Sequence, residues 1–400
     1  MLKEDSVGIV DLSELRDLVD NLVNSAQKLQ DAIIKSYLWE HLQDIVDKYY
    51  DIGRLIQIKK LDRGYVNESF LIDTEKSEKR FRYFLRKYKR GIREEEVKFE
   101  HSIIKHLMAR NFTLAASIIK RVDGLTYVKE EKEIDDEIEE IYFAIFEFLN
   151  GEDKYTWDNP LCTEKELESS ARVLAKYHSN IYDLKPEGRR YEPKILELLP
   201  TISGDLMKYA KRAGTTKFDA YFFKNLDHIL SVIDETLSQF HSGAYSNLLQ
   251  LAIHCDFHPG NLKFENEEVI GMFDFDWSKI DVRIFDVALA IVYFCSTWEG
   301  KEDGDLLLDR VDRFISAYQS EAAKQDTVGA MNGNEMDFLP VMIKAANLYV
   351  LNWDVDDFYI KKQNPYEYLI YLQHNVRLMR WIENNWKDLV NVVKKFSYVN

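Results

Sequence analysis

The segment from Ile253 to Phe264 constrains this chain more than any other part of its sequence. It runs Ile-His-Cys-Asp-Phe-His-Pro-Gly-Asn-Leu-Lys-Phe, and Met-Phe-Asp-Phe-Asp-Trp follows at 272–277. Apolar residues at 252–253 and 269–273 predict short strands that flank a turn rich in polar side chains. Asp and Asn residues often only cap such turns by bonding nearby backbone groups. The joint pattern therefore matters more than any single residue in it.

Three oxygen-bearing side chains, Asp256, Asn261 and Asp274, recur in this segment beside the two histidines His254 and His258. A carboxylate can accept the proton of a hydroxyl group, while an amide oxygen and a second carboxylate are the hard ligands that Mg²⁺ prefers. The spacing therefore predicts phosphoryl transfer. Asp256 is the expected proton acceptor, and Asn261 and Asp274 are the expected metal ligands.

The motif His-x-Asp-x-His-Pro-x-Asn, followed by an apolar strand that ends in Asp, resembles the aminoglycoside phosphotransferase and choline kinase superfamily. These are small-molecule kinases that use ATP and Mg²⁺. The resemblance covers about residues 40–386 and is nearest to the homoserine-kinase-like branch. It implies an α+β, two-lobe protein-kinase-like fold, with a small antiparallel-sheet lobe and a larger, mainly helical lobe. Cys255 stands where the family often has glycine or alanine, which predicts a crowded loop.

The resemblance also points to a phosphate-covering hairpin that contains Gly64, Asn67 and Ser69. A lone glycine is a weak phosphate loop, because cradling a phosphate requires several backbone N–H groups at close range. An ordinary hairpin turn is the alternative. Further along, the backbone around Glu147 to Leu149 is expected to bond the adenine, at the end of a strand that begins near Tyr142.

Arg86 occupies the position where the family has a phosphate-binding lysine. The guanidinium of arginine is a planar fork, whereas the ammonium of lysine is a point charge. Arg86 can still neutralise phosphate, but the resemblance leaves the geometry of this contact open. Glu100, on an expected helix from Glu94 to Met108, is the predicted partner of this cation. A solvated helical glutamate is an equal alternative, because Glu95 and Glu96 stand on the same helix.

Two further carboxylates and the two histidines complete the candidate set. Asp286 precedes an apolar helix over 287–294, where a carboxylate favours the helix start, and the resemblance implies that it braces the catalytic loop. His254, His258 and Asp276 are assigned to loop support or to the acceptor side. Another expected helix ends at His178, which is a better candidate for packing than for binding a ligand.

Length and charge limit the remaining possibilities. A chain of 400 residues exceeds one ordinary core, and we expect an N-terminal helical extension at 1–50, a nucleotide lobe at 51–150 and a helical lobe at 151–400. The net charge of −16 disfavours nucleic acid and anionic membranes as partners. Three scattered cysteines and the lack of a long apolar run fit a cytoplasmic protein.

The N-terminal residues have helical periodicity that predicts a helix over 12–50, opened by Asp11 with Glu14, with a break expected near Ser36. Its apolar residues alternate at spacings of four and three: Leu15, Val19, Leu22, Ala26, Leu29 and Ile33. Packing on the same lobe is the simpler interpretation, and a dimer through this helix is the alternative.

The rest of the chain gives coarser expectations. Residues 129–140 are acidic and predict an exposed turn between strands, 183–200 predict an irregular connection, and 203–250 and 368–386 predict helices. Acidic and aromatic clusters at 298–303 and 353–359 fit an ammonium-bearing acceptor. Solvated loops with buried tryptophans explain them as well.

The sequence thus predicts transfer of the γ-phosphate of ATP to a hydroxyl of a small metabolite. Homoserine-like amino alcohols, choline or ethanolamine, methylthioribose, other sugars and aminoglycosides all stay open as acceptors. A protein kinase is disfavoured because no Ala-Pro-Glu segment follows Asp274. A non-catalytic ATP-binding protein is disfavoured because all three catalytic positions are filled.

Overall fold

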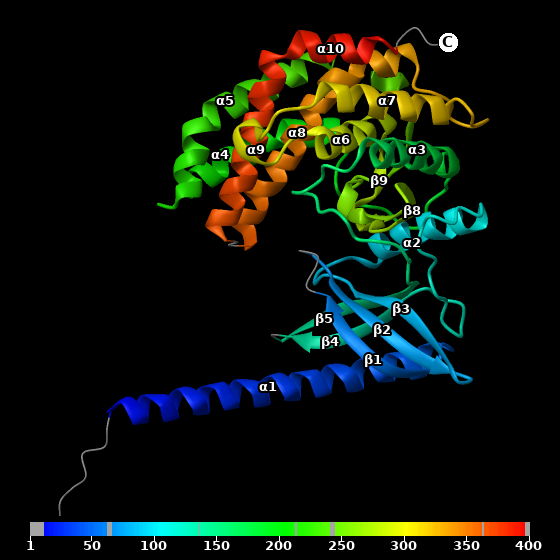
Figure 1. Cartoon of the computed structure of the whole chain (residues 1–400), viewed down its shortest axis with the longest axis vertical. Helices are drawn as coiled ribbons and strands as arrows, with labels where there is room; N and C mark the ends of the chain where they lie inside the picture. The colour runs from blue at the N-terminus through cyan, green and yellow to red at the C-terminus, as the bar shows by residue number, and fades with distance from the viewer. Residues whose placement is uncertain are drawn as a thin grey trace, which may run out of the picture. The chain divides into compact units, whose positions relative to one another are not determined.

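The computed structural model describes residues 12–61, 66–134, 136–212, 214–240, 245–361 and 364–396. The chain forms two compact units, one from 1–91 and 119–148 and the other from 92–118 and 149–400. Within the described residues, no helix combines the length and the apolar character needed to cross a membrane. Figure 1 labels the helices and strands.

The first unit is built on a five-stranded antiparallel sheet. Its order is β1-β2-β3-β5-β4, and the strands are β1 (Arg54–Leu61), β2 (Glu68–Lys76), β3 (Lys79–Lys87), β4 (Val128–Ile134) and β5 (Glu137–Glu147). β2 and β3 pair from Glu68↔Lys87 to Lys76↔Lys79, and β3 pairs with β5 from Tyr83↔Glu147 to Lys87↔Phe143. In β2 the buried residues Phe70, Ile72 and Thr74 alternate with less buried ones, whereas β5 is buried continuously from Tyr142 to Phe146.

Helix α1 (Leu12–Tyr49) supplies the other side of this core. Leu42, Ile45 and Val46, from its last turns, are buried against sheet residues that include Phe70 and Leu85. An ion pair between His41 and Glu130 (2.8 Å) also ties the helix to β4. The predicted helix is confirmed, whereas the predicted break near Ser36 is wrong because α1 continues through that residue. Asp11, its expected cap, lies outside the described residues.

The second unit is mainly helical. Its α-helices are α2 (Glu94–Ala109), α3 (Glu164–Ile181), α4 (Ile195–Ala210), α5 (Lys217–Gln239), α6 (Arg283–Cys295), α7 (Leu308–Ala322), α8 (Gly333–Lys361), α9 (Pro365–Asn384) and α10 (Trp386–Lys394). Two small antiparallel pairs, β6 (Gln250–Ile253) with β9 (Lys279–Val282) and β7 (Leu262–Glu265) with β8 (Glu268–Met272), lie among them. Almost every residue of α6 is buried, which explains its continuous apolar sequence.

Three expectations about this architecture are wrong in detail. The acidic segment 129–140 forms the strands β4 and β5 themselves, in which cross-strand pairs such as Lys129 with Glu140 offset the charge. Residues 183–200 are only partly irregular, because α4 begins at Ile195, whose N–H donates to Asp281 (2.7 Å). Residues 353–359 lie within α8 and not in a loop.

Candidate functional site

The segment that contains Asp256 connects strand β6 to strand β7. After β6 ends at Ile253, the chain crosses to the short 3-10 helix η2 (Pro259–Asn261) and continues directly into β7. Strand β8 then leads to a second 3-10 helix, η3 (Phe275–Trp277), and β9 returns to pair with β6. Two hairpin-like pairings therefore hold Asp256 and Asp274 on neighbouring turns of the second unit.

Asp256 and Asn261 are joined directly. The side-chain amide of Asn261 donates to the carboxylate Oδ2 of Asp256 and to its backbone oxygen, both at 2.9 Å. The Asp256 side chain keeps 24% of its surface exposed, whereas Asn261 is buried. The amide nitrogen of Asn261 donates both of these hydrogen bonds. The side-chain oxygen Oδ1 takes no part in them and remains as an acceptor.

His258 lies near the same oxygen of this carboxylate. Its Nδ1 accepts from the backbone N–H of Gly260 (3.0 Å), so its Nε2 bears the proton when the ring is neutral. That Nε2 lies 3.7 Å from Oδ2 of Asp256. The ring also meets Tyr293 edge to face, with 5.5 Å between the centroids. His258 therefore lies next to the carboxylate that we expect to receive a proton.

Asp274 is linked to the same loop through its neighbour Phe273. The Phe273 N–H donates to the carbonyl of Asn261 (3.1 Å), and the Phe273 carbonyl accepts from Nε2 of His254 (3.1 Å). Asp274 itself has a left-handed backbone (φ 71°) immediately before η3. This conformation costs free energy in a residue other than glycine, and residues that adopt it are common in active sites.

Asp286, in the first turn of α6, binds the backbone before Asp256. Its two oxygens accept from the N–H groups of His254 and Cys255, both at 2.8 Å, and one also accepts from Nε2 of His178 (3.0 Å). Burial alone would raise the pKa of Asp286, yet the hydrogen bonds from His178 and His254 outweigh it and lower the pKa. Asp286 is thus a buried, ionised anchor beneath the loop.

His254 and Cys255, whose N–H groups donate to Asp286, are both constrained in further ways. Burial lowers the pKa of His254, which favours the neutral ring that donates to Phe273. Cys255 has a left-handed backbone (φ 64°) and is buried, with its Sγ 3.8 Å from the hydroxyl of Tyr349. A left-handed backbone explains why glycine suits this position, and the loop here accommodates a side chain at some conformational cost.

The expected phosphate residues lie in the first unit. Ser69 and Arg86 are directly opposite each other on β2 and β3, and both are buried. The Arg86 guanidinium lies 5.5–5.8 Å from the ring centroids of Phe84, Tyr88 and Phe146. Asn67 accepts from the backbone N–H of Lys89 (2.9 Å). Gly64 lies outside the described residues.

The other expected residues are divided between the units. Glu147 is exposed at the end of β5, opposite Tyr83, whereas Leu149 begins the second unit. Glu100 is buried in α2, which also belongs to the second unit. Asp276 lies in η3, and its carbonyl accepts from Arg190 (2.9 Å).

The donor set at the loop fits a hard divalent cation. Within the described ranges, no three His, Cys, Asp or Glu side chains form a metal cluster. An amide oxygen and one carboxylate are nevertheless enough when water and phosphate oxygens complete the coordination, as is usual for Mg²⁺. Asn261 has this oxygen available because its nitrogen is held by Asp256.

Sequence reasoning missed Tyr293 and left the role of Asp354 open. Burial, followed by the charges of Asp256 and Asp354, raises the pKa of the Tyr293 hydroxyl well above its ordinary value. The carboxylates of Asp256 and Asp354 therefore both influence the hydroxyl of Tyr293, although almost a hundred residues of sequence separate the two acids. Tyr293 is on the apolar helix α6, where a tyrosine at helical spacing gives no signal that separates a site residue from a core residue.

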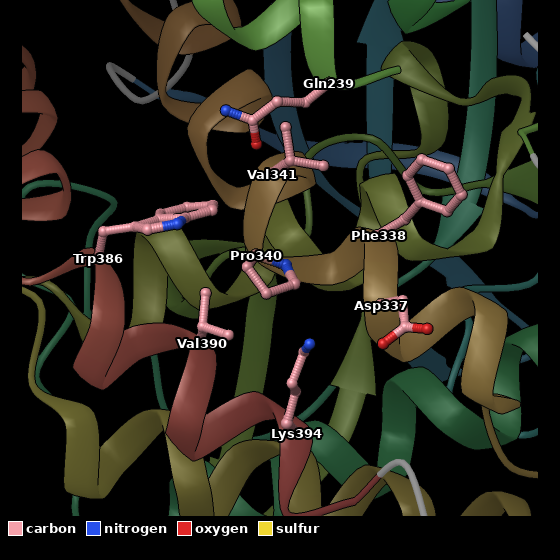
Figure 2. A pocket seen from close by; sticks show the side chains of 8 residues that line it. All are labelled: Gln239, Asp337, Phe338, Pro340, Val341, Trp386, Val390 and Lys394. Carbon is pink, nitrogen blue, oxygen red and sulfur yellow. The ribbon is translucent and has the colours of Figure 1, made fainter. Parts of the chain in front are cut away.

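A cavity of about 290 Å³ lies elsewhere in the second unit, lined by α5, α8 and α10. Figure 2 shows its lining side chains: Gln239, Asp337, Phe338, Pro340, Val341, Trp386, Val390 and Lys394. None of the predicted site residues is among them. This cavity is therefore separate from the candidate site.

Comparison with known proteins finds homoserine kinases among the relatives of this chain. Homoserine kinase from Zymomonas mobilis is 26% identical over 293 residues, which cover 73% of this chain and 80% of that protein. Homoserine kinase from Methylocella silvestris is 24% identical over 337 residues, with 82% and 90% covered.

Solved structures show the same fold at low identity. An amicoumacin kinase in complex with AMP-PNP and Ca²⁺ matches with a TM-score of 0.61 and 14% identity, covering 92% of this chain and 96% of that one. Choline kinase from Cryptosporidium parvum matches with a TM-score of 0.53 and 16% identity, covering 90% and 99%. The predicted α+β, protein-kinase-like fold is confirmed.

The description "phosphotransferase enzyme family" belongs to a family model that matches residues 57–322. The match spans more than half of the chain and includes Arg86, Asp256, Asn261, Asp274 and Asp286. The chain therefore belongs to the phosphotransferase enzyme family and is a phosphotransferase that acts on a small molecule.

Proposed function

We propose that this protein transfers the γ-phosphate of ATP to the hydroxyl group of a small amino alcohol, with Mg²⁺ as the metal. The observation that supports this most directly is the pairing of Asp256 with Asn261, because it fixes a partly exposed carboxylate beside an amide oxygen. A proton acceptor and a metal ligand are thereby held on one rigid turn. Positioning of this kind accounts for much of the rate in phosphoryl transfer.

Asp256 is assigned the proton-transfer step. Its carboxylate accepts the proton of the acceptor hydroxyl while the hydroxyl oxygen forms a bond to the γ-phosphorus. The bond from that phosphorus to the bridging oxygen breaks, and ADP leaves with the electron pair. His258, 3.7 Å from Oδ2, keeps the carboxylate oriented.

Asn261 and Asp274 are assigned to Mg²⁺, which would neutralise charge on the β- and γ-phosphates when bound. Asn261 offers Oδ1, and Asp274 offers a carboxylate on the adjoining turn. Arg86, Ser69, Asn67 and Gly64 are assigned to the phosphates. The backbone between Glu147 and Leu149 is assigned to adenine.

Four residues have supporting roles in this proposal. Asp286 and His254 fix the backbone of His254 and Cys255, because they bond it to α6 and to Phe273. Asp276 is assigned to the acceptor side, and Glu100 to the partner of the Arg86 cation. These residues position the reacting groups and make no bond to the transferred phosphate.

An ammonium group on the acceptor is supported by two observations. Several curated relatives are named homoserine kinases, and homoserine is an amino alcohol. In addition, Asp354 is fully buried and accepts from Asn375 (2.6 Å) through only one of its oxygens, with no hydrogen-bond partner recorded for the other. Burial raises the pKa of Asp354 well above its ordinary value, so the acid is held neutral without ligand, and an ammonium group beside it would favour the charged form.

An acceptor panel tests this assignment. The purified protein is incubated with Mg·ATP and, in turn, homoserine, ethanolamine, choline, methylthioribose and an aminoglycoside, and ADP release is compared with the rate without acceptor. We expect kcat/KM to be highest for an amino alcohol. A preference for a neutral sugar would contradict the ammonium assignment but would leave the kinase assignment intact.

The variant Asp256→Ala tests the proton acceptor. Loss of a general base in a positioned site typically costs a factor of ~10²–10⁴ in rate, so phosphorylation should fall at least a hundredfold while nucleotide binding, measured by calorimetry, persists. Asp234→Ala, at an exposed position of α5, is the control and should keep full activity. Turnover retained by Asp256→Ala would refute the assignment.

A further inference from the structure

Helix α1 has two apolar faces on different sides of its axis. The residues that pack on the sheet are in its last turns: Leu38, Leu42, Ile45, Val46 and Tyr49. By their spacing in the sequence, the alternating apolar residues from Leu15 to Ile33 fall on a different side of an α-helix. At 100° per residue the mean directions of the two groups differ by roughly 150° around the helix. The N-terminal face is therefore not a continuation of the face that packs on the sheet.

The described side chains of this N-terminal face are exposed. Val19 retains 53% of its surface, Leu22 69% and Leu29 64%. Figure 1 shows the first turns of α1 extending past the edge of the sheet of the same unit. Packing on the same unit, the simpler interpretation of the sequence, thus leaves these residues without cover. Large apolar side chains in a continuous row on a surface commonly mark an interaction site.

The row follows a heptad repeat for about three heptads. Leu12, Val19, Ala26 and Ile33 occupy position a, and Leu15, Leu22 and Leu29 occupy position d. Polar residues occupy most of the opposite side, including the exposed Asp20, Asn21 and Lys28. The repeat ends at Ser36, directly before the helix turns its other face to the sheet. The row is therefore about 35 Å long, at 1.5 Å per residue.

We propose that the N-terminal half of α1 forms a parallel, two-stranded coiled coil with the same segment of a second copy of this chain. β-Branched residues at a with leucine at d favour two parallel strands, and Val19 and Ile33 alternate with Leu15, Leu22 and Leu29 in this way. In a symmetric parallel dimer, each residue of the row faces the same residue of the other copy across the two-fold axis. A second copy can therefore cover the whole row.

The charges of this segment argue against a membrane surface as the partner. Residues 12–36 contain four acidic and three basic side chains: Glu14, Asp17, Asp20 and Asp31 against Arg16, Lys28 and Lys35. A membrane-surface helix is typically rich in Lys and Arg on its polar face. The whole chain, with a net charge of −16, is repelled by anionic lipid. The proposal is independent of the phosphotransferase function.

Sedimentation of the full-length protein tests the association. The chain has a mass of 47.2 kDa, and we expect a species of twice that mass. Leu22→Glu with Leu29→Glu places charge in the seam and should give a monomer. Asn21→Glu with Lys28→Gln lowers the net charge by the same amount on the opposite side and should stay dimeric. Both variants should keep their phosphotransferase activity, since neither pair contacts the sheet core.

Cross-linking tests the parallel register. The three native cysteines are buried, so a new cysteine is the accessible thiol. Leu22→Cys places two thiols at facing d positions in a parallel dimer and should give a covalent dimer on mild oxidation. Asp20→Cys, on the polar side, should not.

Several outcomes would overturn the proposal. These are a monomer at every concentration, a larger oligomer, a dimer that persists in Leu22→Glu with Leu29→Glu, or failure of Leu22→Cys to cross-link. Flotation of the monomer with vesicles of phosphatidylcholine and phosphatidylserine would assign the face to a membrane instead.

Discussion

At the scale of single residues, burial has opposite consequences for two carboxylates of the second unit. Asp286 and Asp354 are both fully buried. Asp286 receives N–H groups from His178, His254 and Cys255, which outweigh burial and lower its pKa. Asp354 receives a hydrogen bond only from Asn375, which lowers its pKa less than burial raises it, so its pKa lies well above the ordinary value. The number of donors decides which acid stays charged.

This difference predicts a pH dependence for Asp354→Asn. Because the folded-state pKa of Asp354 is raised, its stabilising contribution is complete below the unfolded-state pKa, near ~4, and is lost as the pH rises through the folded-state pKa. Asparagine stays neutral and keeps the bond with Asn375. The free energy of unfolding of the variant, relative to the native protein, should therefore rise by up to ~1.4 kcal/mol per pH unit above about pH 5.

Urea unfolding of both proteins at several pH values between about 5 and 8 measures this difference. Asp234→Asn, at an exposed position, is the control, and its difference from the native protein should not vary with pH. A constant difference for Asp354→Asn would show that Asp354 does not hold a proton in the folded protein.

At the scale of elements, α1 is part of the first unit's core and not an appendage to it. Ile45 is 1% exposed and packs with the sheet residues Phe70, Leu85 and Phe143. Leu42 and Val46 of this helix belong to the same buried cluster. The division predicted from the sequence, between residues 1–50 and 51–150, takes no account of the core that α1 shares with the sheet.

We therefore expect Ile45→Ala to lower the free energy of unfolding by ~2–5 kcal/mol, the usual cost of a large-to-small change in a core. Ile138→Ala, in the same unit but at a residue 74% exposed, is the matched control and should change it by less than ~0.5 kcal/mol. Circular dichroism during urea unfolding measures both. Equal effects would mean that α1 contributes no core to this unit.

At the scale of the whole molecule, the proposed nucleotide contacts come from residues in both units. Arg86 and Ser69 belong to the unit formed by the sheet, whereas Asn261 and Asp274 belong to the helical unit. A ligand that contacts both sets binds only the folded chain. Binding of this kind stabilises a protein by mass action.

Mg²⁺ with a non-hydrolysable ATP analogue should therefore raise the Tm. At about a hundredfold excess over Kd the gain is ~2.7 kcal/mol. Asp274→Ala should lose the part of the shift that depends on Mg²⁺, and chelation by EDTA should have the same effect on the native protein. Asp256→Ala should keep the shift, since Asp256 is assigned to the acceptor. A full Mg²⁺-dependent shift in Asp274→Ala would remove Asp274 from the metal site.

Several elements were predictable because their signals are local. Helix α2 begins and ends within one residue of the predicted positions, since periodicity and charge mark it. The acidic strand β4 and the acidic first half of β5 were not predictable in this way. Their pairing depends on cross-strand ion pairs, and sequence alone does not show which residues face each other.

The sequence by itself led to the roles proposed for Asp256, Asn261 and Asp274, because their spacing combines a proton acceptor with two oxygen ligands. It also determined the alternating apolar row of α1. Only the tertiary structure decided that Asp286 bonds the loop backbone, that Asp256 and Asp354 both influence Tyr293, and that Val19, Leu22 and Leu29 of α1 are exposed. Hydrogen bonds and burial depend on residues brought together by folding, and their distance along the chain gives no sign of them.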